Sequence, residues 1–336
     1  MKLLYLSHPE TDYGAEHLWF GLCQQLGSEN VVDFPYHYTF HGKAEQLQNP
    51  EVRNYLANHR ESPLAKGGYS APLHWMPSSK GAEYSYEDIK KLIKSGEFDI
   101  ILLPSPREIN LHFADRLKHD NCLNAENLVF TDFEDSSFIR YDIIDYFKPV
   151  CSFKSNLVSK TDDIHPLPMA SPIVDNLKYA LISSEPKKVD LYARLGHTTM
   201  DRRIFLDLIK GISNIFVSSD HTHYVNYLEE IAKSKIAICM RGFGHITVRH
   251  FEIPSFKTLM FMENLQARIP YPFEDGKTCV IFDPYDLRDF ISKLEYYLTN
   301  ENERQRIAEA GYEHVKKYHT CKARAQQFID TIEKCH

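Results

Sequence analysis

Arginine, glycine and histidine residues gather in one short stretch of the second half of the chain, directly after the apolar run 236–240. The stretch reads Arg241-Gly-Phe-Gly-His and is followed closely by Arg249. Glycines in such a turn let backbone N–H groups approach a phosphate, and the start of the next helix favours an anion. Guanidinium groups donate paired hydrogen bonds to phosphate oxygens. The pattern predicts a site for a phosphorylated ligand, and its candidate residues are Arg241, Gly242, Gly244, His245 and Arg249.

Glu252 follows this stretch and lies in the first turn of the expected helix. A carboxylate accepts two hydrogen bonds at once, so it suits the vicinal hydroxyls of a ribose or another sugar. The alternative is structural: the glycines only make the turn, and Glu252 only stabilises the positive end of a helix dipole. The residue types alone leave both interpretations open.

The candidate residues can form one site only if the strands that precede them end at the same edge of a sheet. Short apolar runs without strict alternation are typical of parallel strands that are buried on both faces. Such runs occur at Leu3–Leu6, Asp99–Leu103, Leu128–Thr131, Val150–Phe153, Val189–Ala193, Ile215–Val217, Ile236–Met240, Leu259–Met262 and Thr278–Phe282. Amphipathic segments alternate with them, among them Asp286–Leu298, Asn302–Tyr318 and Ala323–Ile332. The sequence therefore predicts an α/β fold with parallel sheets.

The length of 336 residues corresponds to about two domains. The polar, proline-rich stretch 159–188 is the expected boundary region. We expect an N-terminal domain over 1–170, with an insertion at about 34–86, and a C-terminal domain over 171–320. The remaining residues, 321–336, are expected to form a helix that packs back on the N-terminal domain.

The composition argues against several classes of protein. A formal net charge of −7 does not suit a general nucleic-acid binder. No apolar run approaches the roughly 20 residues of a membrane span, and residues 1–6 are too few for a secretory signal, so we expect a cytoplasmic protein without membrane insertion. The seven cysteines are widely spread without a C-x-x-C pair, which favours reduced thiols over a disulfide framework or a zinc site. The 17 histidines show no metal-ligand spacing beyond the pair His221 and His223, so no metal is expected.

An ordered series of motifs covers about a hundred residues, from Tyr227 to Arg324. The series comprises Arg249-His-Phe-Glu, the apolar run 259–262, Pro272-Phe-Glu-Asp-Gly, Phe282-Asp-Pro, the helical segment 286–298, Arg304-Gln-Arg-Ile-Ala-Glu-Ala-Gly and Val315-Lys-Lys-Tyr-His-Thr. This order resembles the C-terminal half of GT-B-fold glycosyltransferases of the group 1 type, and it is most similar to their CgeB-like spore-maturation branch. The resemblance implies two Rossmann-like domains that face each other across a cleft, with the nucleotide sugar bound by the C-terminal one.

By this resemblance, Glu252 corresponds to the glutamate that binds the nucleotide ribose. Many retaining members carry another glutamate eight positions earlier, where this chain has Gly244, so the resemblance does not fix the stereochemical outcome. The family's usual glycine five positions after the glutamate is replaced by Lys257. Lys257 could contact a phosphate or could be a surface residue.

The segment from Arg194 to Arg203 resembles the first loop of the family's nucleotide-binding domain, in which an arginine faces the donor diphosphate. Arg202 or Arg203 fits this role best, because both precede an apolar helical segment, and Arg194 is the competitor. The alternative is that these arginines belong to an ordinary charged first turn of a helix.

The first half carries a weaker resemblance. Asp12-Tyr-Gly-Ala-Glu-His resembles the opening loop and helix of many GT-B enzymes, and Gly14 would then allow close approach of the donor. An acceptor hydroxyl needs a group of near-neutral pKa to take its proton, so Asp12, His8 and His17 are candidate bases. A second acidic cluster, 132–135, follows another expected strand.

The resemblance implies a glycosyltransferase of hexosyl or related type that needs no metal or other cofactor, because preorganised cations neutralise the departing diphosphate. Its donor would be a nucleotide sugar. Its acceptor, whether a glycan, a small molecule, a protein or modified DNA, is not specified. Two alternatives remain: a sugar-nucleotide epimerase on the same architecture, and a non-catalytic nucleotide-sugar-binding or coat protein.

Overall fold

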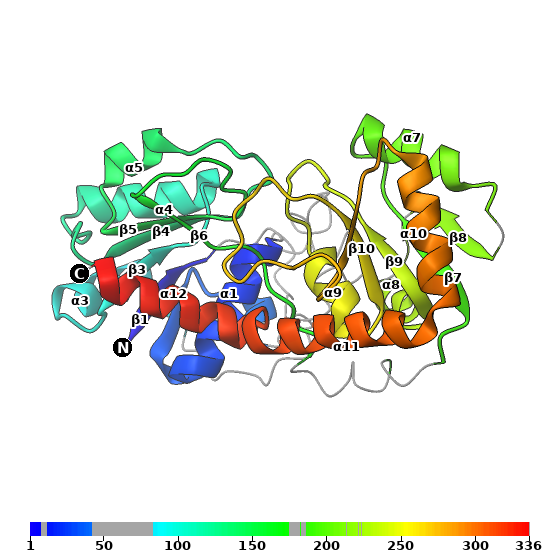
Figure 1. Ribbon diagram of the computed structural model, residues 1–336. Helices are drawn as coiled ribbons and strands as arrows, with labels where there is room; N and C mark the ends of the chain where they lie inside the picture. The colour runs from blue at the N-terminus through cyan, green and yellow to red at the C-terminus, as the bar shows by residue number, and fades with distance from the viewer. Residues whose placement is uncertain are drawn as a thin grey trace. The chain divides into compact units, whose positions relative to one another are not determined.

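The computed structural model describes residues 1–7, 12–41, 83–174, 182, 186–212, 214–220, 222 and 224–335. By the contacts among its residues the chain divides into two units, which are seen in Figure 1. Unit 1 comprises Met1–Pro168 with Cys321–His336, and unit 2 comprises Met169–Thr320. The first unit ends at Pro168, two residues before the boundary that the sequence predicts after residue 170. Most of the expected insertion at 34–86 lies outside the described residues.

Unit 1 is built on a six-stranded parallel sheet with the strand order β2-β1-β3-β4-β5-β6. The strands are β1 (Leu3–Leu6), β2 (Val31–Phe34), β3 (Ile100–Leu103), β4 (Leu128–Asp132), β5 (Cys151–Lys154) and β6 (Ile164–Pro166). Alternate residues of β1 enter different core clusters, Leu3 and Tyr5 in one and Leu4 and Leu6 in the other. The two-residue period of a strand requires this when both faces of the sheet are covered.

The helices of unit 1 are α1 (Tyr13–Leu26), α3 (Tyr86–Lys94), α4 (Glu108–His119), α5 (Tyr141–Phe147) and α12 (Cys321–Cys335), and short 3₁₀ turns cover Ser28–Asn30 and Tyr38–His41. The carboxylate of Asp12 caps α1 by accepting the N–H of Ala15 at 3.1 Å. Helix α12 runs along α1 (Figure 1), and Gly21 permits their close approach. A Cβ atom on Gly21 would lie 2.0 Å from the carbonyl oxygen of Cys321.

Unit 2 is built on a five-stranded parallel sheet with the order β11-β10-β9-β7-β8. Its strands are β7 (Val189–Arg194), β8 (Ile215–Ser218), β9 (Ser234–Cys239), β10 (Leu259–Glu263) and β11 (Val280–Phe282). Its helices are α7 (Met200–Ile209), α8 (Tyr224–Ala232), α9 (Arg249–Ser255), α10 (Leu287–Thr299) and α11 (Glu301–Tyr318). The apolar side of α10 packs its Phe290 and Leu294 into the core that the strands form.

Every apolar run that predicts a strand forms one, with ends that agree to within two residues. The α/β fold with parallel sheets is therefore confirmed. Two strands were not predicted, β2 and β6. β6 is three residues long and contains a histidine and a proline, so its composition does not distinguish it from a loop. None of the helices in the described part of the chain has the length and apolar character that a bilayer crossing requires.

The expectation that all cysteines are free thiols is wrong for one pair. Cys151 at the start of β5 and Cys335 at the end of α12 form a disulfide across a sequence separation of 184 residues. No spacing rule could identify this pair, because the chain passes through the whole of unit 2 between the two residues. The remaining cysteines are free, namely Cys23, Cys122, Cys239, Cys279 and Cys321.

Candidate functional site

The strand order of unit 2 reverses between β7 and β9, because β8 lies on one side of β7 and the later strands lie on the other. Ligands of open α/β sheets bind outside the carboxyl ends of the strands at such a reversal. Helix α7 follows β7, and the turn Gly242–Gly244 and helix α9 follow β9. Both arginine-containing segments of the sequence therefore meet at this point of the sheet.

Arg202 joins the two segments. The residue is only 3% exposed, and Nη2 donates to the carbonyl oxygen of Met240 at 2.5 Å while Nη1 donates to the hydroxyl of Thr198 at 3.1 Å. Its Nε is buried and has no partner. Burial, followed by the nearby charge of Arg249, lowers the pKa of Arg202 to about 10, so the group remains a cation at neutral pH. A buried cation with an unused donor is suited to bind an anion.

His250 belongs to the same group, although it was not among the residues that the sequence predicts for the site. Its Nδ1 hydrogen-bonds with the backbone of Thr247, and its buried Nε2 has no partner. Burial, together with the charges of the neighbouring Arg202 and Arg249, lowers the pKa of His250 to about 4. The imidazole is therefore neutral at pH 7. Its position between Arg249 and Glu252 in the sequence was the available signal.

Glu252 is 2% exposed and lies at the start of α9. Its Oε1 accepts the hydroxyl of Tyr224 at 2.7 Å, and its Oε2 accepts the hydroxyl of Tyr227 at 2.9 Å. Burial raises the pKa of Glu252. The guanidinium of Arg249 lies over the ring of Tyr227, 5.4 Å from its centroid. Each carboxylate oxygen has a second lone pair, so Glu252 can accept a further hydrogen bond from a ligand.

The other predicted arginines have different surroundings. Arg194 forms a paired hydrogen bond with Glu230, at 2.9 Å for each of the two nitrogens. Arg203 is exposed on α7, one residue after Arg202. Arg241 is half-buried and pairs with Asp201 at 2.6 Å.

The predicted glycines make the turn after β9. The N–H of Gly242 donates to the carbonyl oxygen of Gly244 at 2.9 Å, so the turn itself uses this group. A Cβ atom on Gly242 would lie 3.5 Å from Nη2 of Arg202, which is an ordinary contact. His245 is half-buried, and burial and the charge of Arg241 lower its pKa.

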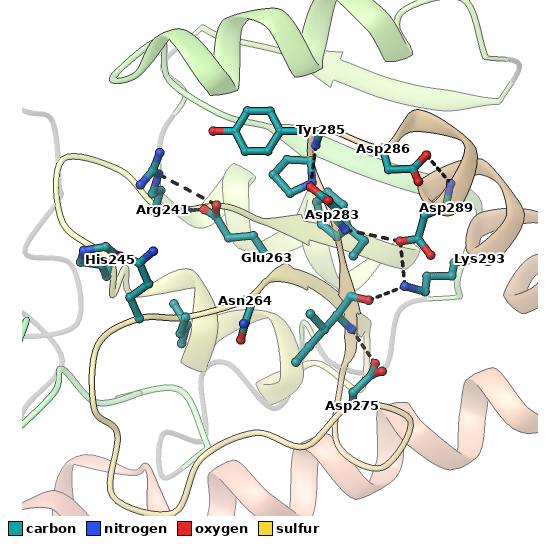
Figure 2. Close-up of a pocket in the computed structure, with 15 residues that line it drawn as sticks. Arg241, His245, Glu263, Asn264, Asp275, Asp283, Tyr285, Asp286, Asp289 and Lys293 are labelled. Atoms are coloured by element: carbon teal, nitrogen blue, oxygen red, sulfur yellow. Dashed lines mark hydrogen bonds and ion pairs between the residues drawn. The ribbon is translucent and has the colours of Figure 1, made fainter. Parts of the chain in front are cut away.

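A cavity of about 770 Å³ lies at the carboxyl ends of β9, β10 and β11, and Figure 2 shows its lining. Of the predicted residues, Arg241 and His245 line it. Carboxylates outnumber cations in the lining; the charged residues are Glu263, Asp275, Asp283, Asp286, Asp289, Arg241 and Lys293. Several carboxylates already hold partners, as in the Asp289–Lys293 ion pair at 2.7 Å. Excess negative charge would repel a diphosphate, so the cavity suits one less well than the surroundings of Arg202 do.

The strand order of unit 1 reverses between β1 and β3. Asp12 follows β1 and Arg107 follows β3, and Nε of Arg107 lies 3.8 Å from the carboxylate of Asp12. Asp12 is buried and its backbone N–H donates to Glu16 at 3.2 Å. The candidate base Asp12 is therefore held at the reversal by a cation and by the first turn of α1.

Glu16 and His17 are buried beside Asp12. Burial raises the pKa of Glu16 to about 8, so Glu16 is mainly protonated at pH 7. Burial lowers the pKa of His17 to about 4, so His17 is neutral, and its Nδ1 has no partner. A neutral imidazole with an unpartnered nitrogen can accept a proton, whereas a protonated Glu16 cannot.

Three further predicted features have a structural explanation or cannot be placed. A Cβ atom on Gly14 would lie 2.2 Å from the ring of Phe133, so packing requires the glycine. In the acidic cluster 132–135, Asp132 is buried in an ion pair with Lys154 at 2.9 Å. His8 lies outside the described residues, as do His221 and His223.

Comparison with known proteins gives two results. Residues 207–330 match a protein-family model described as glycosyl transferase-like. A search of curated proteins returns no match.

Solved structures resemble the whole chain. Anabaena HepE in complex with UDP-glucose is 11% identical, with a TM-score of 0.57 over 99% of this chain and 100% of that chain. An alpha-glucosyltransferase in complex with UDP-glucose and DNA containing an abasic site is 11% identical, with a TM-score of 0.57 over 99% of each chain. Sucrose-phosphate synthase from Thermosynechococcus elongatus is 11% identical, with a TM-score of 0.52 over 99% of each chain. The chain therefore has the GT-B fold, as predicted.

Proposed function

We propose that this protein is a glycosyltransferase that binds a nucleotide sugar in unit 2 and transfers the sugar to an acceptor hydroxyl bound by unit 1. The observation that carries this proposal is Arg202, a buried cation with an unused donor at the strand-order reversal of unit 2. A leaving nucleoside diphosphate develops negative charge, and a cation fixed in advance stabilises that charge without reorganisation.

Glu252 supports the same proposal from the neighbouring helix. We assign it to the ribose hydroxyls, because its oxygens have free lone pairs beside those used by Tyr224 and Tyr227. UDP-glucose is the first donor to test, since the solved HepE and alpha-glucosyltransferase structures contain it. A hexosyl donor is part of the proposal on this ground.

On the acceptor side we assign the proton-accepting role to His17: burial holds its pKa at about 4, below the near-neutral range of a base, and the carboxylate of Asp12 raises it toward that range. It is neutral at pH 7 and has an unpartnered ring nitrogen, whereas the neighbouring Glu16 is protonated. Asp12 would orient the imidazole and stabilise the imidazolium that forms, because a carboxylate nearby raises the affinity of His17 for a proton. His8 remains a candidate by its position in the sequence alone.

The test is a thermal-shift titration of the full-length protein with UDP, GDP and UDP-glucose. A ligand that binds the native state raises its melting temperature. We expect a shift in the wild type and a loss of affinity of about 10-fold or more in Arg202→Ala and Glu252→Ala, since each removes a charge-assisted hydrogen bond. Arg203→Ala is the matched control, because Arg203 is exposed on the same helix, and it should bind as the wild type does.

Turnover distinguishes transfer from the alternatives. Release of nucleoside diphosphate that depends on an added acceptor supports a transferase. A change in the stereochemistry of the donor sugar without an acceptor would instead indicate an epimerase. Binding without either reaction would indicate a non-catalytic protein, and equal binding by wild type, Arg202→Ala and Glu252→Ala would overturn the donor site.

Two finer assignments belong to the proposal. We propose that transfer needs no metal, because Arg202 and Arg249 can supply the charge for which other enzymes use a cation. Turnover that survives a chelator such as EDTA would support this, and turnover that stops and returns with added Mg²⁺ or Mn²⁺ would contradict it.

We also propose that the chain is related to the CgeB-like branch, because its C-terminal motifs follow one another in the same order as in that branch.

A further inference from the structure

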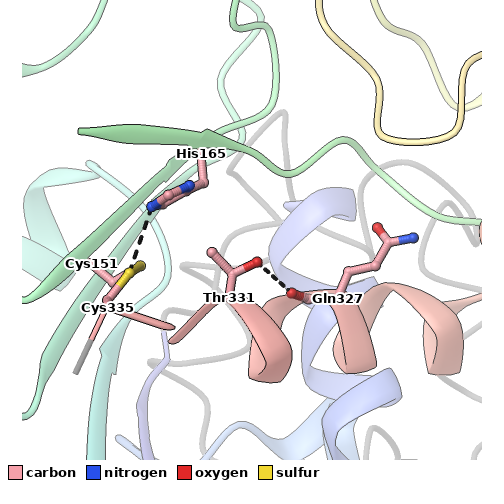
Figure 3. The surroundings of a disulfide bond; sticks show 5 residues. All are labelled: Cys151, His165, Gln327, Thr331 and Cys335. Atoms are coloured by element: carbon pink, nitrogen blue, oxygen red, sulfur yellow. Dashed lines mark hydrogen bonds between the residues drawn. A yellow bond between two sulfur atoms is a disulfide. The ribbon is translucent and has the colours of Figure 1, made fainter. Parts of the chain in front are cut away.

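Two cysteines and a histidine from three separate segments converge in unit 1 (Figure 3). Cys151 begins β5, His165 lies on β6 and Cys335 ends α12. One sulfur or ring nitrogen of each residue lies within 4.8 Å of the other two. Cys151 is buried, and the other two side chains are half-buried, so a small ion can reach the group.

One distance in the group matches a metal site. Nε2 of His165 lies 3.6 Å from Sγ of Cys335. Around a tetrahedral zinc ion, Zn–S bonds of about 2.3 Å and Zn–N bonds of about 2.05 Å separate sulfur from nitrogen by about 3.6 Å. A disulfide requires no imidazole beside it, so the disulfide alone does not account for the convergence of all three side chains. The ring of His165 also contacts that of Phe153, with centroids 5.7 Å apart, which limits its rotation.

We propose that Cys151, His165 and Cys335 bind a zinc-like divalent cation when the two cysteines are reduced. Water would complete the tetrahedron. In a reducing environment a cysteine pair is more often a metal site than a disulfide. The site holds the end of α12 against β5 and β6, and its residues belong to unit 1, whereas Arg202 belongs to unit 2. A structural ion here is therefore compatible with a transfer reaction that uses no metal.

The disulfide and the metal site are two states of the same side chains. Reduction by a phosphine adds two hydrogens to the sulfurs and breaks the S–S bond, while the phosphine takes the oxygen of a water molecule and becomes the phosphine oxide. Binding of Zn²⁺ then releases the two thiol protons to solvent and forms two metal–thiolate bonds. A small-molecule disulfide such as oxidised glutathione would take up two electrons from the thiolates and leave as two thiols, re-forming the Cys151–Cys335 bond and releasing the ion.

The experiment uses the full-length protein, reduced with tris(2-carboxyethyl)phosphine, stripped of metal and titrated with Co²⁺. We expect about one Co²⁺ per chain with the absorption of a tetrahedral thiolate complex, and displacement of Co²⁺ by Zn²⁺. Cys151→Ser, Cys335→Ser and His165→Ala should each weaken binding about 10-fold or more, because each removes one ligand. Cys122→Ser is the matched control: it removes a buried thiol of the other core cluster of unit 1 and should leave binding unchanged.

Circular dichroism at each titration point shows whether a variant is folded, so that loss of binding is not confused with unfolding. The proposal is overturned if the reduced, folded wild type binds no Co²⁺ or Zn²⁺. It is also overturned if Cys151→Ser or Cys335→Ser binds as tightly as Cys122→Ser does. Unchanged binding in His165→Ala would overturn the three-residue site.

Discussion

At the scale of single residues, burial decides the charge of the group at the start of α1. Glu16 is 4% exposed and its carboxyl has a pKa of about 8 instead of about 4.5. The folded protein therefore keeps a proton on Glu16 that the unfolded chain releases above about pH 4.5. Below about pH 4.5 Glu16 is protonated in both states and does not reduce the free energy of unfolding. Between pH 4.5 and 8 the free energy of unfolding falls by about 1.4 kcal/mol per pH unit, because only the unfolded chain loses the proton.

The change Glu16→Gln removes this dependence, because glutamine resembles the protonated side chain and cannot ionise. We expect the variant to match the wild type at pH 5 and to exceed its free energy of unfolding at pH 8 by roughly 1 to 4 kcal/mol. Denaturant unfolding at the two pH values measures this difference. The exposed Glu29→Gln is the control and should have the same small effect at both. A Glu16→Gln effect that is equal at pH 5 and pH 8 would contradict the buried, protonated carboxyl.

At the scale of elements, the contact between α1 and α12 depends on one residue without a side chain. Helix propensity alone predicts that Gly21→Ala stabilises α1 by about 1 kcal/mol. The structure predicts the opposite sign, because the new Cβ would lie 2.0 Å from the backbone oxygen of Cys321 and 2.9 Å from the Cβ of Ala325. We expect a net destabilisation of about 1–3 kcal/mol, which thermal or denaturant unfolding measures.

Gly211→Ala is the matched control for this prediction. No atom lies within 4 Å of a Cβ built on Gly211, so its substitution should not destabilise the protein. Equal or increased stability in Gly21→Ala would show that the two helices are not in close backbone contact.

At the scale of the whole molecule, unit 1 depends on a helix that follows unit 2 in the sequence. Phe328 of α12 is fully buried in the same core cluster as Leu3 and Trp19. We expect Phe328→Ala to destabilise unit 1 by about 3–5 kcal/mol, since it leaves a large cavity. Hydrogen exchange should then increase in β1 and α1 but not in β9 and β10, because these strands belong to unit 2.

The exposed Phe138→Ala is the control within unit 1, as its side chain is 78% exposed in the wild type. Uniform acceleration of exchange across both units in Phe328→Ala would mean that the two units unfold together.

The sequence predicts the strands well because burial on both faces leaves continuous apolar runs such as Leu259–Met262. It does not predict β6, whose residues are too few and too polar to show a pattern. For the site, the sequence locates the arginine-containing loops but cannot choose among Arg194, Arg202 and Arg203. That choice depends on burial, which follows from tertiary packing, and the same holds for His250.

The discontinuity of unit 1 has a consequence for synthesis of the protein. Residues 321–335 leave the ribosome only after all of unit 2 has been translated. The strands of unit 1 are therefore synthesised first. Apolar residues such as Trp19 and Leu22 remain uncovered until α12 has been synthesised and packs on them. Unit 2 has no such dependence. Folding during translation should therefore be completed in the reverse of the order in which the two sheets are made, and a nascent chain arrested before residue 321 is the species that most needs a chaperone.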